Sequence, residues 1–210
     1  MRKRMIMSGV YLDHQSASPV DSRVAEFAGP FLSTGLGNPS SLHSRGLAAK
    51  AALEEARAKV ADLINAEIPE SIIFTAGATE ANNLAVRGAA LRNPALGKKL
   101  LASQIEHISV LNPHKDLKKA GFELDLVSVD STGIIDLAAL ERLLGKETVL
   151  TSVMYANGEI GTIEPIKEVS ALVHEKGNLL HVDAAAAAGK VRIDVQKDNI
   201  DLLTISSNDL

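Results

Sequence analysis

The stretch Ser71-Ile-Ile-Phe-Thr-Ala-Gly-Ala-Thr-Glu80 carries the pattern on which the fold of this chain is built. A short run of β-branched and aromatic residues, typical of a strand, passes through Gly77 into a segment with helical spacing that begins near Thr79. A strand that turns at a glycine into a helix is the usual unit of an α/β protein. The stretch therefore predicts a strand over residues 71–75 and a helix over residues 79–93.

The same alternation extends in both directions along the chain. Further strands are predicted over residues 99–103, 123–127, 148–153, 178–182 and 202–205. Further helices are predicted over residues 44–66 and 165–176, where Pro165 suits a first helical turn. This pattern predicts an α/β fold of three layers, a mainly parallel sheet with helices on both faces. Ligands of such a sheet bind at the carboxyl ends of its strands.

Composition narrows the class of protein before any motif is considered. The 210 residues are 46% hydrophobic, enough for a large core, and the net charge of −4 comes without a concentration of Lys and Arg. Nucleic-acid binding is therefore not expected. The basic Met1-Arg2-Lys3-Arg4 is followed by too few apolar residues for a signal peptide, and no run reaches membrane-spanning length. We expect a cytoplasmic location without membrane contact. The absence of cysteine excludes disulfides and thiolate metal sites within these residues.

The end of the first predicted strand is suited to an anion. Backbone N–H groups at the start of the helix near Thr79, together with its hydroxyl, would bind a phosphate. The alternative is that Thr79 only caps the helix, with Glu80 in its first turn.

Two other strand ends carry a histidine and an aspartate. His107 follows the strand at 99–103 and could stack on a planar ring or move a proton, or else be solvated or cap a helix. Asp183 follows the strand at 178–182 and could pair with a protonated ring nitrogen such as that of pyridoxal phosphate (PLP), or cap residues 184–188. Together, a phosphate site, a ring-facing histidine and a strand-end aspartate describe a PLP pocket.

The sequences of seven segments, and their order along the chain, resemble those of the cysteine desulfurases, in the class V aminotransferase group of fold-type I PLP enzymes. The Gly-Asn-Pro-Ser-Ser and Gly-Ala-Thr-Glu-Ala-Asn-Asn stretches favour the desulfurases within that group. The segments are Tyr11-Leu-Asp13, Gly37-Asn-Pro-Ser-Ser-Leu-His43, Thr75-Ala-Gly-Ala-Thr-Glu-Ala-Asn-Asn83, Glu106-His107, Gly158-Glu-Ile-Gly161, His181-Val-Asp-Ala184 and residues 201–207.

The resemblance implies a role for each candidate residue. Ala78 and Thr79 would bind the PLP phosphate, with a hydroxyl added by Ser206. His107 would stack on the pyridine ring and assist proton transfer, and Asp183 would keep the ring nitrogen protonated. The family reaction removes sulfur from L-cysteine, passes it to a separate catalytic cysteine and supplies iron–sulfur cluster assembly.

The chain departs from the family where PLP is attached. The family reads Ser-Gly-His-Lys, with the Schiff-base lysine last, whereas this chain reads Ser206-Ser207-Asn208-Asp209. Aspartate has no amine, so covalent attachment of PLP is not expected, and its carboxylate would repel an anionic cofactor.

Two further departures fall on the same side of the cofactor. Gly158 and Ala186 stand where the family has an asparagine and a glutamine that contact the phenolic oxygen of PLP. Lys190, the lysine nearest in sequence to the pocket residues, is the candidate to substitute for the lost amine.

The resemblance also predicts a domain organisation. Residues 1–18 would be an N-terminal arm and residues 19–210 an incomplete, C-terminally truncated PLP-binding large domain. The small domain with the catalytic cysteine would be absent, and the full-length form would be a homodimer.

Three interpretations of function follow. The chain is a cysteine desulfurase-like protein without activity of its own, a PLP-free family member that binds an iron–sulfur scaffold protein, or a non-functional remnant. A minor alternative places a divalent ion between His107, Asp183 and Asp209.

Overall fold

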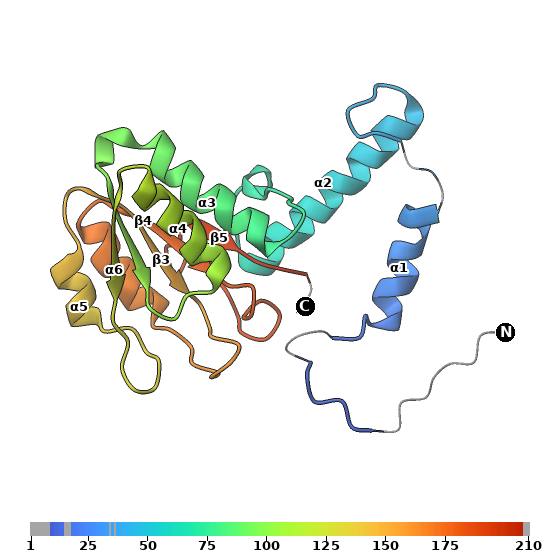
Figure 1. Cartoon of the computed structure of the whole chain (residues 1–210). Coiled ribbons are helices and arrows are strands. Elements are labelled where there is room, and N and C mark those ends of the chain that lie inside the picture. The colour runs from blue at the N-terminus through green and yellow to red at the C-terminus, as the bar shows by residue number, and fades with distance from the viewer. Residues whose placement is uncertain (1–8, 15–17, 34, 36, 208–210) are drawn as a thin grey trace.

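A five-stranded parallel sheet organises the chain in the computed structural model, which describes residues 9–14, 18–33, 35 and 37–207 (Figure 1). The strand order is β2-β1-β3-β4-β5, and every neighbouring pair is parallel. The strands are β1 (Lys99–Ser103), β2 (Glu123–Val127), β3 (Thr148–Met154), β4 (Leu179–Asp183) and β5 (Leu202–Thr204). Five of the predicted strands are thereby confirmed, each to within one residue at either end.

Helices cover both faces of this sheet (Figure 1). On one face α3 (Ala78–Arg92) packs against α4 (Ile108–Lys119), and on the other α5 (Leu137–Leu143) packs against α6 (Ile166–Glu175). The prediction of a three-layer α/β fold is confirmed. The predicted helices at 79–93 and 165–176 correspond to α3 and α6, whereas α4 and α5 were not predicted.

The core lies in two layers, one on each side of the sheet. Successive side chains of a strand point to opposite faces. Leu100 therefore packs with Val86 of α3, whereas Leu101 packs with Val169 of α6 on the other side. Burial on both faces explains why the central residues of β1 form a continuous apolar run and why all seven residues of β3 are buried.

Replacement of Leu100 by alanine is expected to lower the free energy of unfolding by about 2–5 kcal/mol, because the side chain is 0% exposed and its removal leaves a cavity. Urea unfolding followed by circular dichroism measures this. The matched control is Leu91→Ala on α3, where the side chain is 61% exposed and the change should be about 0.5 kcal/mol or less. Equal losses in the two variants would contradict the burial of Leu100.

The strand predicted at residues 71–75 is wrong. The 3-10 helix η1 (Pro69–Ser71) occupies its start, and residues 72–75 belong to neither a helix nor a strand. Ile73 and Phe74 are exposed. A strand needs a neighbour to share its backbone hydrogen bonds, and the described part of the chain places none beside this segment. The carbonyl of Ile72 instead accepts a hydrogen bond from Arg57.

Two N-terminal helices extend away from the sheet (Figure 1). The predicted helix at 44–66 is α2 (Ser44–Ile64), whose carboxyl end joins the body where the carbonyl of Ile64 accepts from the N–H of Val195 at 3.0 Å. The helix α1 (Ser22–Ser33) was not predicted and buries none of its residues. A second 3-10 turn, η2 (Pro94–Leu96), leads into β1. The predicted boundary between residues 18 and 19 stays a prediction.

A directed chain of hydrogen bonds crosses the core beneath the carboxyl ends of the strands. Nδ1 of His114 donates to the carbonyl of Val110 at 2.8 Å, so its Nε2 accepts from the hydroxyl of Ser152 at 3.3 Å. That hydroxyl accepts from Nδ1 of His181 at 3.1 Å, and Nε2 of His181 accepts from Thr204 at 3.2 Å. Burial lowers the pKa of His181 to about 3 and also lowers the pKa of His114. Both rings are therefore neutral and tie α4, β3, β4 and β5 together.

Candidate functional site

A cavity of about 690 Å³ opens at the carboxyl ends of the strands. Its wall is formed by residues that follow β1, β3, β4 and β5 and by the first turns of α3 and α4. The structure brings five predicted site residues into this wall, namely Ala78, Thr79, His107, Asp183 and Ser206. Asp209 lies outside the described residues.

The start of α3 forms one end of the cavity wall. Its N-cap is Gly77, not Thr79, and no side chain in the described chain caps this helix. Thr79 thus lies within the first turn, and the alternative that Thr79 is the cap is wrong. Glu80 is engaged elsewhere, because its carboxylate accepts from the N–H of Ala76 at 2.6 Å. The N–H groups of Ala78 and Thr79 remain at the positive end of the helix dipole, where a phosphate binds well.

His107 both caps a helix and lines the cavity. It is the N-cap of α4, and its Nδ1 accepts from the backbone N–H of Ser109 at 3.2 Å. The hydroxyl of Ser109 lies 2.7 Å from the same nitrogen. The capping interpretation and the cavity interpretation are therefore both satisfied, because one edge of the ring serves the helix and the ring itself stays exposed in the cavity wall.

Asp183 ends β4 with a buried carboxyl group. One oxygen accepts from the N–H of Ala185 at 3.0 Å, and the other accepts from the side-chain amide of Asn82 at 2.8 Å. Residues 184–188 form turns rather than a regular helix, so Asp183 does not cap a helix there. Two donors hold this carboxyl group in the cavity wall.

Glu106 is a polar residue of the cavity that the sequence did not single out as a site residue. Its side chain is 5% exposed, and Oε1 accepts from the hydroxyl of Ser103 at 2.8 Å and from the N–H of Met154 at 2.6 Å. Oε2 has no partner within the described residues. Burial raises the pKa of Glu106 to about 8, with a further increase from nearby Asp183, so the group holds a proton at neutral pH. In the sequence, the only indication that Glu106 is a site residue was its position between a predicted buried strand and His107.

The two smaller residues noted in the sequence lie in the same wall. Gly158 and Ala186 both line the cavity, so neither position offers a polar side chain to a ligand. Lys190 is not among the lining residues. Its Nζ lies 3.5 Å from the carbonyl of Ala186, and its side chain is exposed.

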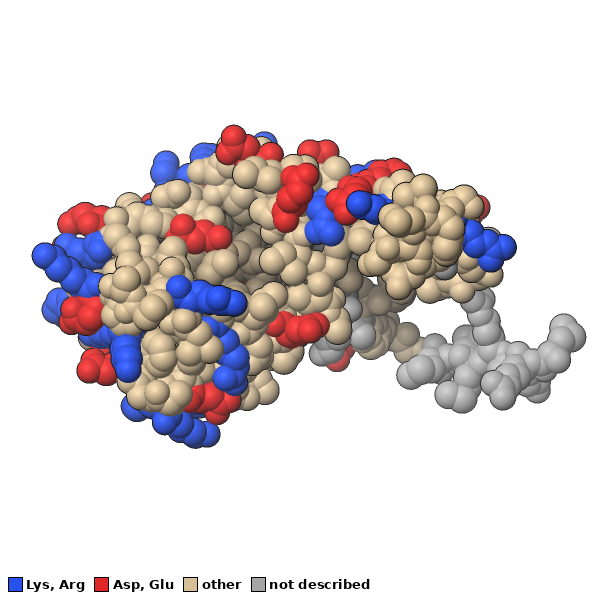
Figure 2. All heavy atoms as spheres, turned by 90° about the horizontal axis from the view of Figure 1, so that it is seen from above, with Lys and Arg blue, Asp and Glu red and all other residues tan. Residues whose placement is uncertain are grey.

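Charged residues of both signs are interspersed over the face that Figure 2 shows. No helix in the described chain is both long and apolar enough to cross a membrane.

No group of three or more potential metal ligands occurs among residues 9–14, 18–33, 35 and 37–207. The predicted ion site also required Asp209, which is not described, and so stays a prediction.

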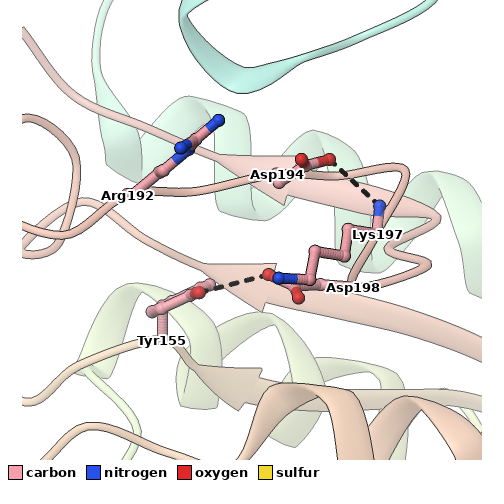
Figure 3. Close-up of a pocket in the computed structure, with 5 residues that line it drawn as sticks. All are labelled: Tyr155, Arg192, Asp194, Lys197 and Asp198. Carbon is pink, nitrogen blue, oxygen red and sulfur yellow. Dashed lines mark hydrogen bonds between the residues drawn. The ribbon is translucent and has the colours of Figure 1, made fainter.

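A second hollow, of about 360 Å³, is lined by none of the predicted site residues (Figure 3). The hydroxyl of Tyr155 donates to Asp198 at 3.1 Å, and Asp194 accepts from the backbone N–H of Lys197 at 3.0 Å. Burial and the adjacent Asp198 raise the pKa of Tyr155 to about 12. The polar groups of this hollow mainly hold the loop after β4 in place.

The fold and the cavity define an α/β protein in which the start of a helix and a buried aspartate line one cavity at the ends of parallel strands. The sequence profile of the class V aminotransferases matches residues 10–209, and the chain belongs to that family. It is 50% identical to cysteine desulfurase IscS 1 of Archaeoglobus fulgidus and 44% identical to cysteine desulfurase IscS of Neisseria meningitidis. These alignments cover 95% and 97% of the chain, respectively. The chain spans about half the length of these relatives, 52% and 50%.

Solved structures agree with this assignment. A NifS-like protein superposes with a TM-score of 0.91 at 36% identity, covering 95% of this chain and 55% of that one. SspA in complex with cysteine superposes with a TM-score of 0.90 at 34% identity, covering 95% of this chain and 57% of that one. The predicted resemblance to cysteine desulfurases is confirmed.

Proposed function

We propose that this chain is a cysteine desulfurase-like protein that binds PLP in the cavity without a covalent bond and does not complete the desulfurase reaction by itself. The observation that carries the proposal is the presence, in one cavity wall, of the uncapped start of α3 and the buried carboxyl group of Asp183. These are the partners that the phosphate and the ring nitrogen of PLP require. The residues present therefore fit the cofactor.

Each residue has a defined task in this proposal. The N–H groups of Ala78 and Thr79, with the hydroxyl of Ser206, bind the phosphate. Asp183, held by two hydrogen bonds, pairs with the ring nitrogen and keeps it protonated. His107 lies against the ring and presents its free edge to the substrate. When bound, PLP supplies an electron sink for chemistry at the α-carbon of an amino acid.

Two absences in the sequence set the limit of this activity. The family lysine is replaced by Asp209, and the 210 residues contain no cysteine to receive sulfur. We therefore expect neither the family's covalent cofactor bond at residue 209 nor a persulfide on these residues. L-cysteine is proposed as the ligand that shares the cavity with PLP, in line with the cysteine bound by the similar SspA.

Titration of the purified chain with PLP tests the proposal. We expect saturable binding, seen as a change in PLP absorbance, and no increase in protein mass after borohydride reduction. Asp183→Asn should weaken binding about tenfold or more, since a charged partner of the ring nitrogen is lost. The control is Asp198→Asn in the second hollow, which should leave PLP binding unchanged.

Absence of PLP binding would contradict the proposal and favour the PLP-free alternative. In that alternative the protein acts by binding an iron–sulfur scaffold protein, as part of a homodimer in the full-length form. An aggregated or unfolded product would instead favour a non-functional remnant.

A further inference from the structure

We propose that Ser109 and Asn82 are positioning residues that fix the tautomer of His107, so that His107 presents its Nε2–H as a donor to the ligand in the cavity. The identity of that ligand rests on the proposed function. The hydrogen bonds that set the tautomer are made by the chain alone.

The orientation of Asn82 is set by Asp183. A carboxylate oxygen accepts hydrogen bonds, so the atom of Asn82 that lies 2.8 Å from Oδ2 of Asp183 is the amide nitrogen. Asn82 is 0% exposed, and the reverse orientation would place the amide oxygen against this carboxylate without water to separate them. The second N–H of the same amide points to the hydroxyl of Ser109, at 2.9 Å.

The hydroxyl of Ser109 is thereby directed at His107. Its oxygen accepts from Asn82, so its single proton is available to Nδ1 of His107, 2.7 Å away. The backbone N–H of Ser109 donates to the same Nδ1 at 3.2 Å. Two donors converge on one nitrogen, which must carry a lone pair and not a proton.

The proton of the neutral ring consequently sits on Nε2. No hydrogen bond to this nitrogen is found in the part of the chain that the structure describes, and the ring is exposed in the cavity wall. The bonds run in one direction, from the amide of Asn82 both to Asp183 and, through Ser109, to His107. The partner of the ring nitrogen and the residue against the ring are thus joined through side chains of α3 and α4. In this tautomer, the Nε2–H of His107 can donate a hydrogen bond to a sulfur, carboxylate or phenolate acceptor of the ligand.

Nitrogen-15 NMR of the imidazole rings tests this without any cofactor. The labelled 210-residue chain is measured near pH 8, and the His107 signals are identified by their loss in His107→Gln. We expect one Nε2–H tautomer in the unsubstituted protein. Ser109→Ala should shift both ring nitrogens toward the values of a mixed population, and Ser109→Thr, which keeps the hydroxyl, should restore them. Asn82→Leu should give an intermediate shift.

The matched control removes a hydroxyl beside another histidine. Ser170 lies 3.1 Å from Nδ1 of His174, and Ser170→Ala should leave the His107 signals unchanged. A mixed or Nδ1–H tautomer in the unsubstituted protein, or no shift in Ser109→Ala, would overturn the proposal. An Asn82→Leu protein identical to the unsubstituted one would overturn the role of Asn82. A single Nε2–H tautomer in a protein that fails to bind PLP would defeat the proposed function and leave this inference standing. PLP binding in a protein whose His107 is a mixture of tautomers would support the proposed function and overturn this inference.

Discussion

Asp209→Lys is expected to convert a protein that yields no borohydride-stable adduct into one that carries PLP on residue 209. If residue 209 corresponds to the family lysine, as the proposal requires, the substitution supplies the missing amine and removes a carboxylate that is expected to repel an anionic cofactor. The increase in mass should approach one PLP per chain. Peptide mapping after reduction identifies which residue carries the PLP adduct.

The control for this gain is a lysine one residue away. Asn208→Lys introduces the same amine and a similar change in charge, but at the position where the family has histidine. Equal labelling of both variants would mean that any added lysine reacts, and the correspondence of Asp209 to the family lysine would be lost. Absence of an adduct in Asp209→Lys, despite saturable PLP binding, would show that the missing amine alone does not explain the departure from the family.

Glu106→Gln is expected to make the protein more stable at pH 8 and to change its stability little at pH 5. The pKa of Glu106 is about 8 in the folded protein and about 4.5 in the unfolded chain. As the pH rises from 4.5 to 8, the unfolded chain releases a proton that the folded protein keeps, so the unsubstituted protein loses stability over this range. The variant has no such proton to release, so at pH 8 its free energy of unfolding should not show the decrease, on the order of 3 kcal/mol, of the unsubstituted protein. Glutamine also keeps an oxygen that accepts from Ser103 and Met154.

Urea unfolding at the two pH values measures this difference. His181 acts in the opposite direction, because its lowered pKa gives stability that is present above about 6.5 and is lost as the pH falls toward about 3. That contribution is common to both proteins and cancels in the comparison. Glu123→Gln, at an exposed position of β2, is the control and should show no pH-dependent gain. A variant that is less stable than the unsubstituted protein at pH 8 would show that Glu106 is ionised in the fold.

The sequence alone determined the α/β class, five of the six predicted strands and the order of the site segments along the chain. Strands such as Lys99–Ser103 are buried on both faces, so they appear as short continuous apolar runs bounded by polar residues. The positions of His107, Asp183 and Ser206 followed because parallel strands bring their carboxyl ends to one edge of the sheet, whereas Ala78 and Thr79 reach the same cavity from the first turn of α3 and not from a strand end.

The tertiary structure decided what depends on neighbours far apart in the chain. Residues 71–75 have the composition of a strand, but strand formation requires a partner for the backbone, and none of the described strands lies beside them. The protonated state of Glu106 comes from burial against β3, and the tautomer of His107 comes from Ser109 and, 27 residues earlier, Asn82. Local sequence reports composition and periodicity, whereas protonation and hydrogen-bond direction depend on which polar groups the completed fold places within about 3 Å of one another.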